Sequence, residues 1–178
     1  MLALAGAALL LPAGLPAADK GTGARTIGWN ELMPKDWDPV RQIREQSRDK
    51  DFGSIKEGSA RELELMDKLR EIWDSAPTRS DLDGARIRLP GYVVPLEQSG
   101  GEVREFLLVP YFGACIHSPP PPANQIVHVV LAKPRAMRTM DTVWVTGTMK
   151  TRRQDSPMGI SGYSMERPVV EPYRAPPR

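Results

Sequence analysis

The sequence predicts a mostly β protein, a small five-stranded barrel with one N-terminal amphipathic helix. Three observations favour this fold. From residue 86 onward the chain alternates strand-forming runs with turns, several of these runs contain a glycine, and one long connection joins two of them. Glycines inside strands suit bends and bulges. Short, bent strands of this kind are typical of the barrel that binds oligonucleotides or oligosaccharides in other proteins. A mixed α+β sandwich is the alternative.

Each expected strand follows either a period of two or a continuous apolar run. The five strands are Arg86–Leu96, Val103–Val109, Ile126–Leu131, Thr142–Thr148 and Gly162–Glu171. Gly91 predicts a bend in the first strand. Pro168 predicts that the last strand lies at an edge, because proline cannot donate a hydrogen bond to a neighbouring strand.

One amphipathic helix of about four turns precedes the strands. Ser59 is its expected N-cap, and Glu62 completes the capping-box pattern three positions later. Pro77 ends it. The apolar stripe of this helix contains Leu63, Met66, Leu69, Ile72 and Trp73. We expect the stripe to pack on the barrel, so that residues 59–174 form one domain.

Residues 1–18 have the pattern of a secretory signal peptide. An uncharged apolar run ends in small residues just before Asp19. The run is too short for a spanning helix, so the mature chain is expected to have no membrane-spanning segment. We expect cleavage after Ala18 and a periplasmic location. Because no Lys or Arg precedes the run, an uncleaved apolar arm is the alternative.

Residues 19–58 are rich in charged residues, glycine and proline, and they predict a flexible or extended segment. Within it, Trp29 and Leu32 share one helical face just before Pro34. This pattern predicts a short hook that lays Trp29 and Trp37 on the surface of the domain. Ordinary packing is the favoured role for these rings, and contact with a partner protein is the alternative.

The overall composition argues against nucleic-acid binding. Lys and Arg total 24 against 22 for Asp and Glu, so the net charge is only +2. Aromatic residues make up 6% of the chain, which is few for a base-stacking platform. The chain has a single cysteine, Cys115, which excludes an internal disulfide.

The segment around Cys115 is where the sequence predicts chemistry. Cys115 and His117 are two residues apart, so on an extended backbone both side chains lie on the same side. A thiolate with an imidazole suits zinc or copper. Two ligands do not complete a site, and His128 is the candidate third ligand. A purely structural Cys/His pair is the alternative. Weaker candidate ligands are Asp141, Met158 and Met165.

A run of prolines follows this pair. Pro119, Pro120, Pro121 and Pro122 predict a stiff, extended polyproline strut that fixes the direction of the two preceding side chains. Next come Asn124 and Gln125, which we expect to cap the turn by hydrogen bonding to the loop backbone.

Four stretches of the chain carry a family resemblance. They read LPGYVVPLE (89–97), EFLLVPYFGACIHSPPPPANQIVHV (105–129), VWVTGTMK (143–150) and GYSMERPVVEPY (162–173). From about Trp29 to Tyr173 the chain resembles the bacterial envelope family catalogued as domain of unknown function 3299. The family motif is intact at Cys115, His117, Pro119 to Pro122, Asn124 and Gln125.

The resemblance implies an exported or lipid-anchored bacterial protein with a small barrel of the oligonucleotide/oligosaccharide type. It also implies genes that often lie beside transporter components, some concerned with metals. It implies no established activity. No cysteine follows the leader to carry a lipid, which favours the soluble periplasmic form.

Taken together, the sequence predicts a periplasmic accessory protein that binds or handles zinc or copper in association with an envelope transporter. The alternative is a non-catalytic interaction module of an envelope complex in which the Cys/His segment is structural. An enzyme with Cys115 as nucleophile and His117 as base is the weakest hypothesis, because no third group that would orient the base is evident.

Overall fold

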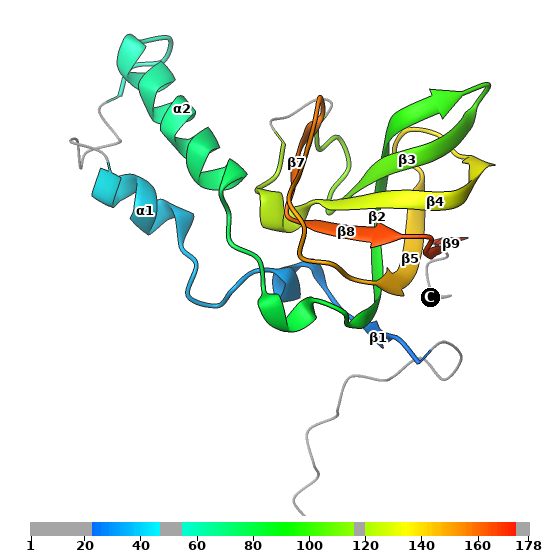
Figure 1. Cartoon of the computed structure of the whole chain (residues 1–178). Coiled ribbons are helices and arrows are strands. Elements are labelled where there is room, and N and C mark those ends of the chain that lie inside the picture. Colours follow the sequence, from blue (N-terminus) through cyan, green and yellow to red (C-terminus); the bar gives the residue numbers. More distant parts are fainter. Residues whose placement is uncertain (1–22, 47–54, 116–119, 174–178) are drawn as a thin grey trace, which may run out of the picture.

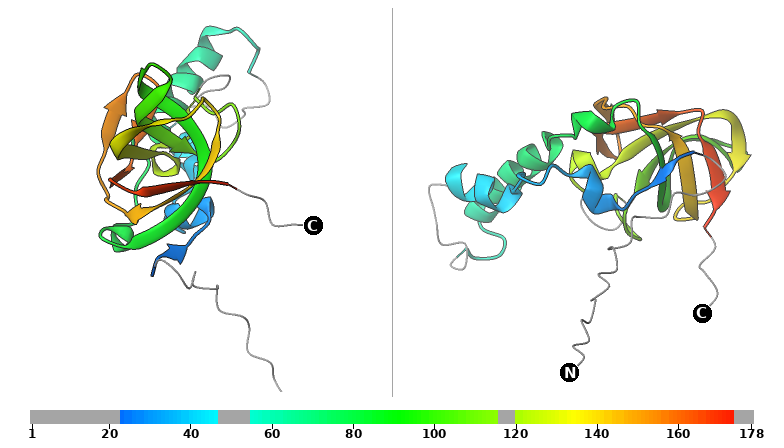
Figure 2. Two further views of the ribbon diagram at one scale, coloured as in Figure 1. Left: turned by 90° about the vertical axis from the view of Figure 1, so that its right-hand side faces the viewer. Right: turned by 90° about the horizontal axis from the view of Figure 1, so that it is seen from below.

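The computed structural model describes residues 23–46, 55–115 and 120–173. Most of the chain after residue 85 forms one curled sheet, which makes the protein mostly β (Figure 1). Six strands follow one another in the order β8-β4-β3-β2-β5-β9, and the short strand β1 pairs parallel with β2. The sheet curls into a half-barrel (Figure 2).

The strands of this sheet are β1 Arg25–Thr26, β2 Arg86–Ser99, β3 Glu102–Val109, β4 Val127–Ala136, β5 Thr142–Thr148, β8 Tyr163–Glu166 and β9 Val169–Pro172. A separate hairpin consists of β6 Gln154–Ser156 and β7 Gly159–Ser161. The described helices are α1 Pro39–Gln46 and α2 Ala60–Asp74, with short 3-10 turns η1 Trp29–Leu32, η3 Ser80–Leu82 and η4 Ala123–Gln125.

The strands expected from the sequence correspond to the observed ones, with one difference. The expected edge strand Gly162–Glu171 is two strands, β8 and β9, which pair with β4 and β5 respectively. The break falls at Arg167, whose backbone is left-handed with φ of 52°, and at Pro168, which has no N–H to donate. The sheet therefore has six strands in its main path where the sequence predicts five.

The long strand β2 makes the sheet curl. Its first half, Arg86 to Tyr92, pairs with β5, and its second half, Tyr92 to Ser99, pairs with β3. Gly91 stands where the partners change. A Cβ atom there would lie 2.8 Å from Leu108 Cγ and 2.9 Å from Trp29 Cζ2, so only glycine allows this approach. Close packing thus explains the glycine at position 91, whereas the register shifts of β2 fall further along, between Pro95 and Gln98.

Strand β3 is buried on both of its faces. Phe106 and Leu108 point into the main core inside the curl. Leu107 and Val109 point outward into a second, smaller apolar cluster, and all four side chains are fully buried. The outer cluster therefore requires a cover over this side of the half-barrel.

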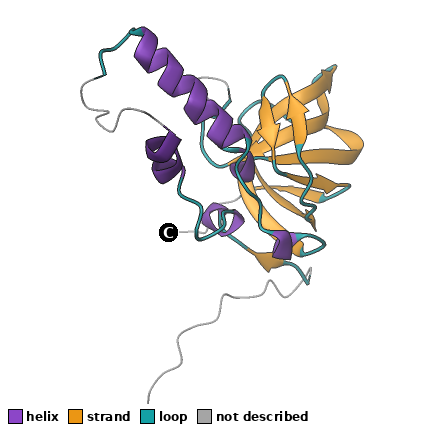
Figure 3. Ribbon diagram, turned by 60° about the vertical axis from the view of Figure 1, so that its left-hand side comes forward, coloured by secondary structure: helices purple, strands orange, loops and turns teal. Residues whose placement is uncertain are grey.

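The α2 helix begins as its sequence predicts. Ser59 Oγ accepts a hydrogen bond from the Glu62 N–H at 3.2 Å, while Glu62 Oε2 accepts from the Gly58 N–H at 2.6 Å. Its main neighbour, however, is α1, and Figure 3 shows the two helices projecting from the sheet as a pair. The α1 helix lies inside the 19–58 segment for which the sequence predicts flexible or extended chain. No helix among the described residues is both long and apolar enough to cross a membrane.

The hook around Trp29 is part of the fold. Leu32 is fully buried in the main core, and Trp29 packs against that core. The indole N–H of Trp29 donates to the Pro90 carbonyl at 2.7 Å, beside the bend in β2. The Trp37 indole nitrogen, by contrast, is buried without a hydrogen-bond partner. Packing is therefore the role of Trp29.

The Tyr163 hydroxyl joins three distant segments. It donates to the Leu32 carbonyl at 2.7 Å and accepts from the Arg79 N–H at 2.7 Å, and the side chain is fully buried. Burial raises the pKa of this phenol. One hydroxyl on β8 thus satisfies two backbone groups from the N-terminal half of the chain.

Replacing this hydroxyl tests its role. We expect Tyr163→Phe to lower the free energy of unfolding by about 1–3 kcal/mol, because the Leu32 carbonyl and the Arg79 N–H lose their partner. Urea denaturation measures the change. Tyr173→Phe is the matched control, because Tyr173 is on the surface and stacks on Trp144. Equal stability of Tyr163→Phe and wild type would contradict the role.

Candidate functional site

The described residues 110–115 and 120–126 contribute to the outer apolar cluster of the half-barrel, and the candidate site lies there. Ala114 is fully buried and packs with Val94, Leu107, Val109 and Ile126 in the outer apolar cluster. Three sulfur-bearing side chains pack against the same cluster and are partly buried. They are Cys115, Met140 and Met158, which we call the sulfur cluster.

Met140 is fixed next to the Cys115 loop. The Gly113 N–H donates to Met140 Sδ at 3.2 Å, and Gly113 is two residues before Cys115. The Met140 N–H in turn donates to the Val93 carbonyl at 2.8 Å, which ties this loop to β2. The thioether sulfur therefore lies against the backbone that presents the thiol.

Backbone strain concentrates in the same place. Among the described residues, the non-glycine residues with a left-handed backbone are Cys115 (φ 65°), Met140 (φ 67°) and Arg167 (φ 52°). Two of these three belong to the sulfur cluster. A non-glycine residue in this region costs of order 1 kcal/mol, and such residues gather at functional sites.

Met158 comes from the turn between β6 and β7. Ser156 Oγ organises this turn, since it accepts from the Met158 N–H at 3.3 Å and donates to the Gly159 carbonyl at 2.7 Å. A Cβ atom on Gly159 would lie 3.1 Å from Pro120 Cβ, so the turn packs closely on the polyproline segment. The sulfur cluster thus draws on three separate parts of the chain.

Burial raises the pKa of the Cys115 thiol to about 11. The thiol is therefore protonated at neutral pH, which makes Cys115 a poor nucleophile. A metal ion could still bind it by displacing the proton. The chemistry that fits this environment is coordination of a metal with a high affinity for sulfur.

His117 and Pro119 lie outside the described residues, so the proposed pairing of Cys115 with His117 stays a prediction. The residues on either side of 116–119 are described. Pro121 is buried, and Pro122 has φ of −54° and ψ of 149°, close to polyproline geometry. The described end of the proline run is therefore extended and packed.

Asn124 and Gln125 bond mainly to distant backbone. Asn124 Nδ2 donates to the Pro77 carbonyl, and Gln125 Nε2 donates to the Trp29 carbonyl, both at 3.0 Å. Gln125 Nε2 also lies 3.0 Å from the carbonyl of Asn124, within its own loop. Both side chains are buried. They connect the Cys115 loop to the N-terminal segments, beyond the local cap that the sequence predicts.

His128, the candidate third ligand, lies on the outer face of β4. It is opposite Leu107 of the outer cluster, so it shares a face of the sheet with the sulfur cluster. Its Nε2 is 2.5 Å from Glu105 Oε1, and only 3% of the side chain is exposed. His128 therefore already has a strong partner.

The weaker candidates divide clearly. Met158 packs against the same outer apolar cluster as Cys115, whereas Met165 is fully buried in the main core inside the curl. Asp141 accepts a hydrogen bond from the Arg138 N–H at 2.8 Å and belongs to a surface turn. Met140 was not a candidate from the sequence, because nothing in its spacing links it to Cys115. Among the described residues, no group of three or more His, Cys, Asp or Glu side chains could hold a metal ion.

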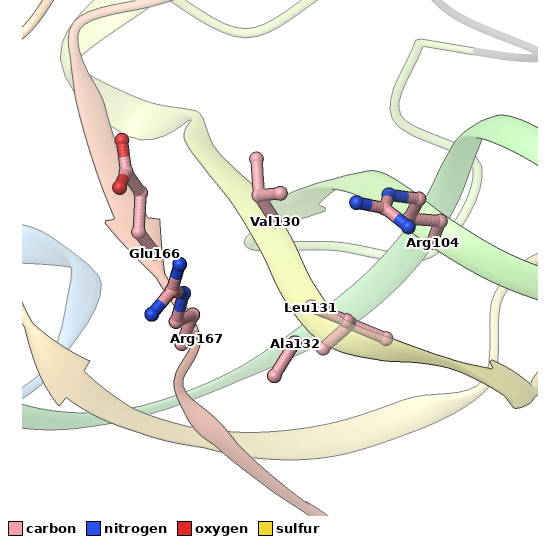
Figure 4. A pocket seen from close by; sticks show the side chains of 6 residues that line it. All are labelled: Arg104, Val130, Leu131, Ala132, Glu166 and Arg167. Carbon is pink, nitrogen blue, oxygen red and sulfur yellow. The ribbon is translucent and has the colours of Figure 1, made fainter.

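A hollow elsewhere on the surface lies over β4 and β8, and no residue of the sulfur cluster lines it (Figure 4). Its volume is ≈ 510 Å³. Arg104, Arg167 and Glu166 bring charges of both signs to it, and Glu166 lies 3.7 Å from Arg152. These charges indicate a solvated surface, without donors gathered for one ligand.

The chain is similar to known proteins over most of its length. The family described as "Protein of unknown function (DUF3299)" matches residues 29–172. The chain belongs to the DUF3299 family. A crystal structure of a DUF3299 family protein from Pseudomonas aeruginosa PAO1 has 36% sequence identity and a TM-score of 0.63, covering 86% of this chain and 99% of that one. No curated protein matches the chain.

The raised pKa of Cys115 predicts slow alkylation. With a pKa of about 11, about one thiol in a thousand is ionised at pH 8, and the rate should rise about tenfold per pH unit up to pH 10. Iodoacetamide labelling followed by mass spectrometry measures this rate. The chain unfolded in urea, with a thiol near 9.0, should react about a hundredfold faster at pH 8. A rate that levels off below pH 9 in the folded protein would contradict the shift.

Proposed function

We propose that this DUF3299 protein is a periplasmic accessory protein that binds a transition metal, zinc or copper, through Cys115. The observation that carries the proposal is that the single thiol of the chain packs on one apolar cluster together with two thioethers. His117, two residues along the chain, adds an imidazole to the donors available there. Thiolate, thioether and imidazole are the ligands that such metals prefer.

The surroundings of Cys115 suit a site that is loaded with metal after folding. The thiol is partly buried and held on a loop with fixed backbone, so little ordering is needed on binding. Metal binding must release the thiol proton, so affinity should fall as the pH is lowered. The neighbouring polyproline segment keeps the loop stiff.

His128 is a less favourable third ligand than the thioethers. To bind a metal through Nε2 it would have to give up its 2.5 Å contact with Glu105 while almost fully buried. We therefore assign His128 and Glu105 to the support of the sheet face on which the outer cluster rests.

We further infer that the half-barrel corresponds to a five-stranded barrel of the oligonucleotide/oligosaccharide-binding type. Three features support this. The β4 and β8 strands are parallel, and β2 pairs with both β3 and β5. In addition, Lys150 and Ser164 form a backbone bridge with two hydrogen bonds of 2.9 Å, which joins the end of β5 to β8 across the open side. The inference concerns architecture only, since fold does not fix function.

The periplasmic location rests on the leader, residues 1–18. An association with an envelope transporter is part of the same proposal and rests on the family resemblance alone, which implies genes that lie beside transporter components. In this role the protein would hold a metal that the transporter delivers or removes.

Metal titration tests the function directly. The purified chain from Asp19 onward should bind Zn²⁺ or Cu⁺ near one equivalent with submicromolar affinity. Cys115→Ser should lose the binding of either ion, and His117→Ala should lose the binding of Zn²⁺. Calorimetry with a competing chelator gives stoichiometry and affinity. His128→Gln serves as the comparison and should bind like wild type. A folded wild-type protein that binds neither ion would refute metal handling.

The α1–α2 pair favours a second candidate function, a non-catalytic interaction module. An almost wholly apolar groove of ≈ 280 Å³ lies along it, lined by Pro39, Val40, Ile43, Leu65, Met66, Leu69 and Trp73. Val40 and Met66 are about half exposed. Such a patch on a projecting helical pair suits contact with another protein.

The two functions are separable by mutation. A Val40→Glu, Met66→Glu double variant changes only exposed side chains, so it should fold and bind metal like wild type. If the groove is the interaction surface, this variant should no longer cross-link to subunits of the transporter encoded beside its gene, whereas Cys115→Ser should still do so. Cross-linking yield from cells is the measurement. Undiminished cross-linking of the double variant would exclude the groove.

A further inference from the structure

We propose that the sulfur cluster is a site for monovalent copper, with Cys115 Sγ, Met140 Sδ and Met158 Sδ as its ligands. This inference rests on the proposed metal-binding function. It chooses between zinc and copper, and it assigns the two thioethers as ligands beside the Cys115 thiolate. It assigns roles to Met140 and Met158, which lie 25 and 43 residues after Cys115 in the chain.

The three proposed ligands come from three separate segments of the chain. Cys115 comes from the loop after β3, Met140 from the turn between β4 and β5, and Met158 from the tip of the β6–β7 hairpin. All three side chains pack against one apolar cluster whose members come from β2, β3 and the Cys115 segment. Tyr92 and Leu96 pack against the same cluster, but the other three side chains packed there all carry sulfur, the softest donor atom of the chain.

The positions of the thioethers are held by backbone hydrogen bonds. Met140 Sδ accepts from the Gly113 N–H at 3.2 Å, which uses one of its two lone pairs and leaves the other for a metal. The Met140 N–H is bonded to Val93, and the Asp141 N–H to the Arg138 carbonyl at 3.0 Å. Preorganised ligands of this kind reduce the entropy that metal binding would cost.

Met158 is held just as firmly. Ser156 Oγ bonds both the Met158 N–H and the Gly159 carbonyl, and Gly159 packs against Pro120. Gly159 has φ of 141°, a conformation that side chains rarely adopt. The hairpin therefore keeps its tip, with Met158, close to Pro120.

Charge decides between monovalent copper and zinc. One thiolate with two thioethers carries a single negative charge, so Cu⁺ gives a neutral complex. Zn²⁺ would leave a positive charge against the apolar side chains of Val94, Leu107 and Ile126, which is costly. Thioethers are also ligands that select Cu⁺, and zinc sites are built from thiolate, imidazole and carboxylate.

The binding step is a proton-for-metal exchange without oxidation or reduction. The S–H bond of Cys115 breaks, its electron pair forms the S–Cu bond, and the proton passes to the solvent. The two methionine sulfurs donate lone pairs and lose nothing. The co-reactant is Cu⁺ itself, which the experiment must supply under anaerobic conditions.

Methionine-to-leucine substitutions test the ligands, because they conserve volume and remove only the sulfur. In the chain from Asp19 onward, Met140→Leu and Met158→Leu should each weaken Cu⁺ binding about tenfold or more, measured against a chromophoric Cu⁺ chelator under anaerobic conditions. Zn²⁺ affinity, measured in parallel, should not change in either variant. Met33→Leu, at a partly buried methionine just after η1 and outside the sulfur cluster, is the matched control and should leave both affinities unchanged.

X-ray absorption of the Cu⁺-loaded wild-type protein gives an independent readout that does not depend on any variant. Three sulfur neighbours would support the site, and a nitrogen-dominated shell would overturn it. Cu⁺ or Zn²⁺ binding that is lost in Cys115→Ser yet unchanged in both methionine variants would overturn the copper site and leave the proposed function standing. A wild-type protein that binds neither ion would overturn both.

Discussion

The close approach at Gly91 is the constraint on which the rest of the structure depends. A single strand, β2, serves two neighbours in succession, and it can do so because a position without a side chain lets Leu108 and Trp29 approach its backbone. The β2 strand thereby joins the β5 side of the half-barrel to the β3 side. The same close approach explains why the N-terminal hook belongs to the core: the Trp29 ring packs against Gly91, and its N–H donates to the Pro90 carbonyl.

The candidate site is a consequence of this curvature. Because β3 is buried on both faces, the outer face of the sheet cannot be left to water, and Ala114 and Ile126 help to cover it. The cover is attached by Asn124 and Gln125 to the same N-terminal segments that close the core. The thiol and the thioethers therefore lie on a surface whose geometry is set by the barrel, and a site built on such a support keeps its ligands in place.

The strands and the start of α2 could be predicted from the sequence, because both the alternation of apolar residues and the Ser59 cap depend only on residues close together in the chain. It could not predict the division of the last strand, which depends on which partner each half finds. Nor could it predict the α1 helix, whose Ile43 is buried only because α2 lies beside it. For the proposed site, the sequence indicated Cys115 with His117, then His128, and gave Met158 only as a weaker candidate. It missed Met140, because its link to the loop is a hydrogen bond between Gly113 and a sulfur in a distant turn.

The hydroxyl of Tyr163 has a consequence for the order in which the molecule becomes complete. A chain leaves the ribosome from its N-terminus, so Leu32 and Arg79 are synthesised long before the side chain that satisfies both of their backbone groups. The β8 strand must also pair in parallel with β4, a contact between distant parts of the chain. Until residue 163 is present, the Leu32 carbonyl and the Arg79 N–H lack their shared partner, and until residue 158 is present the Cys115 thiol lacks one of the two thioethers that pack on the same cluster. The thiol is therefore shielded only when nearly the whole chain is available to fold.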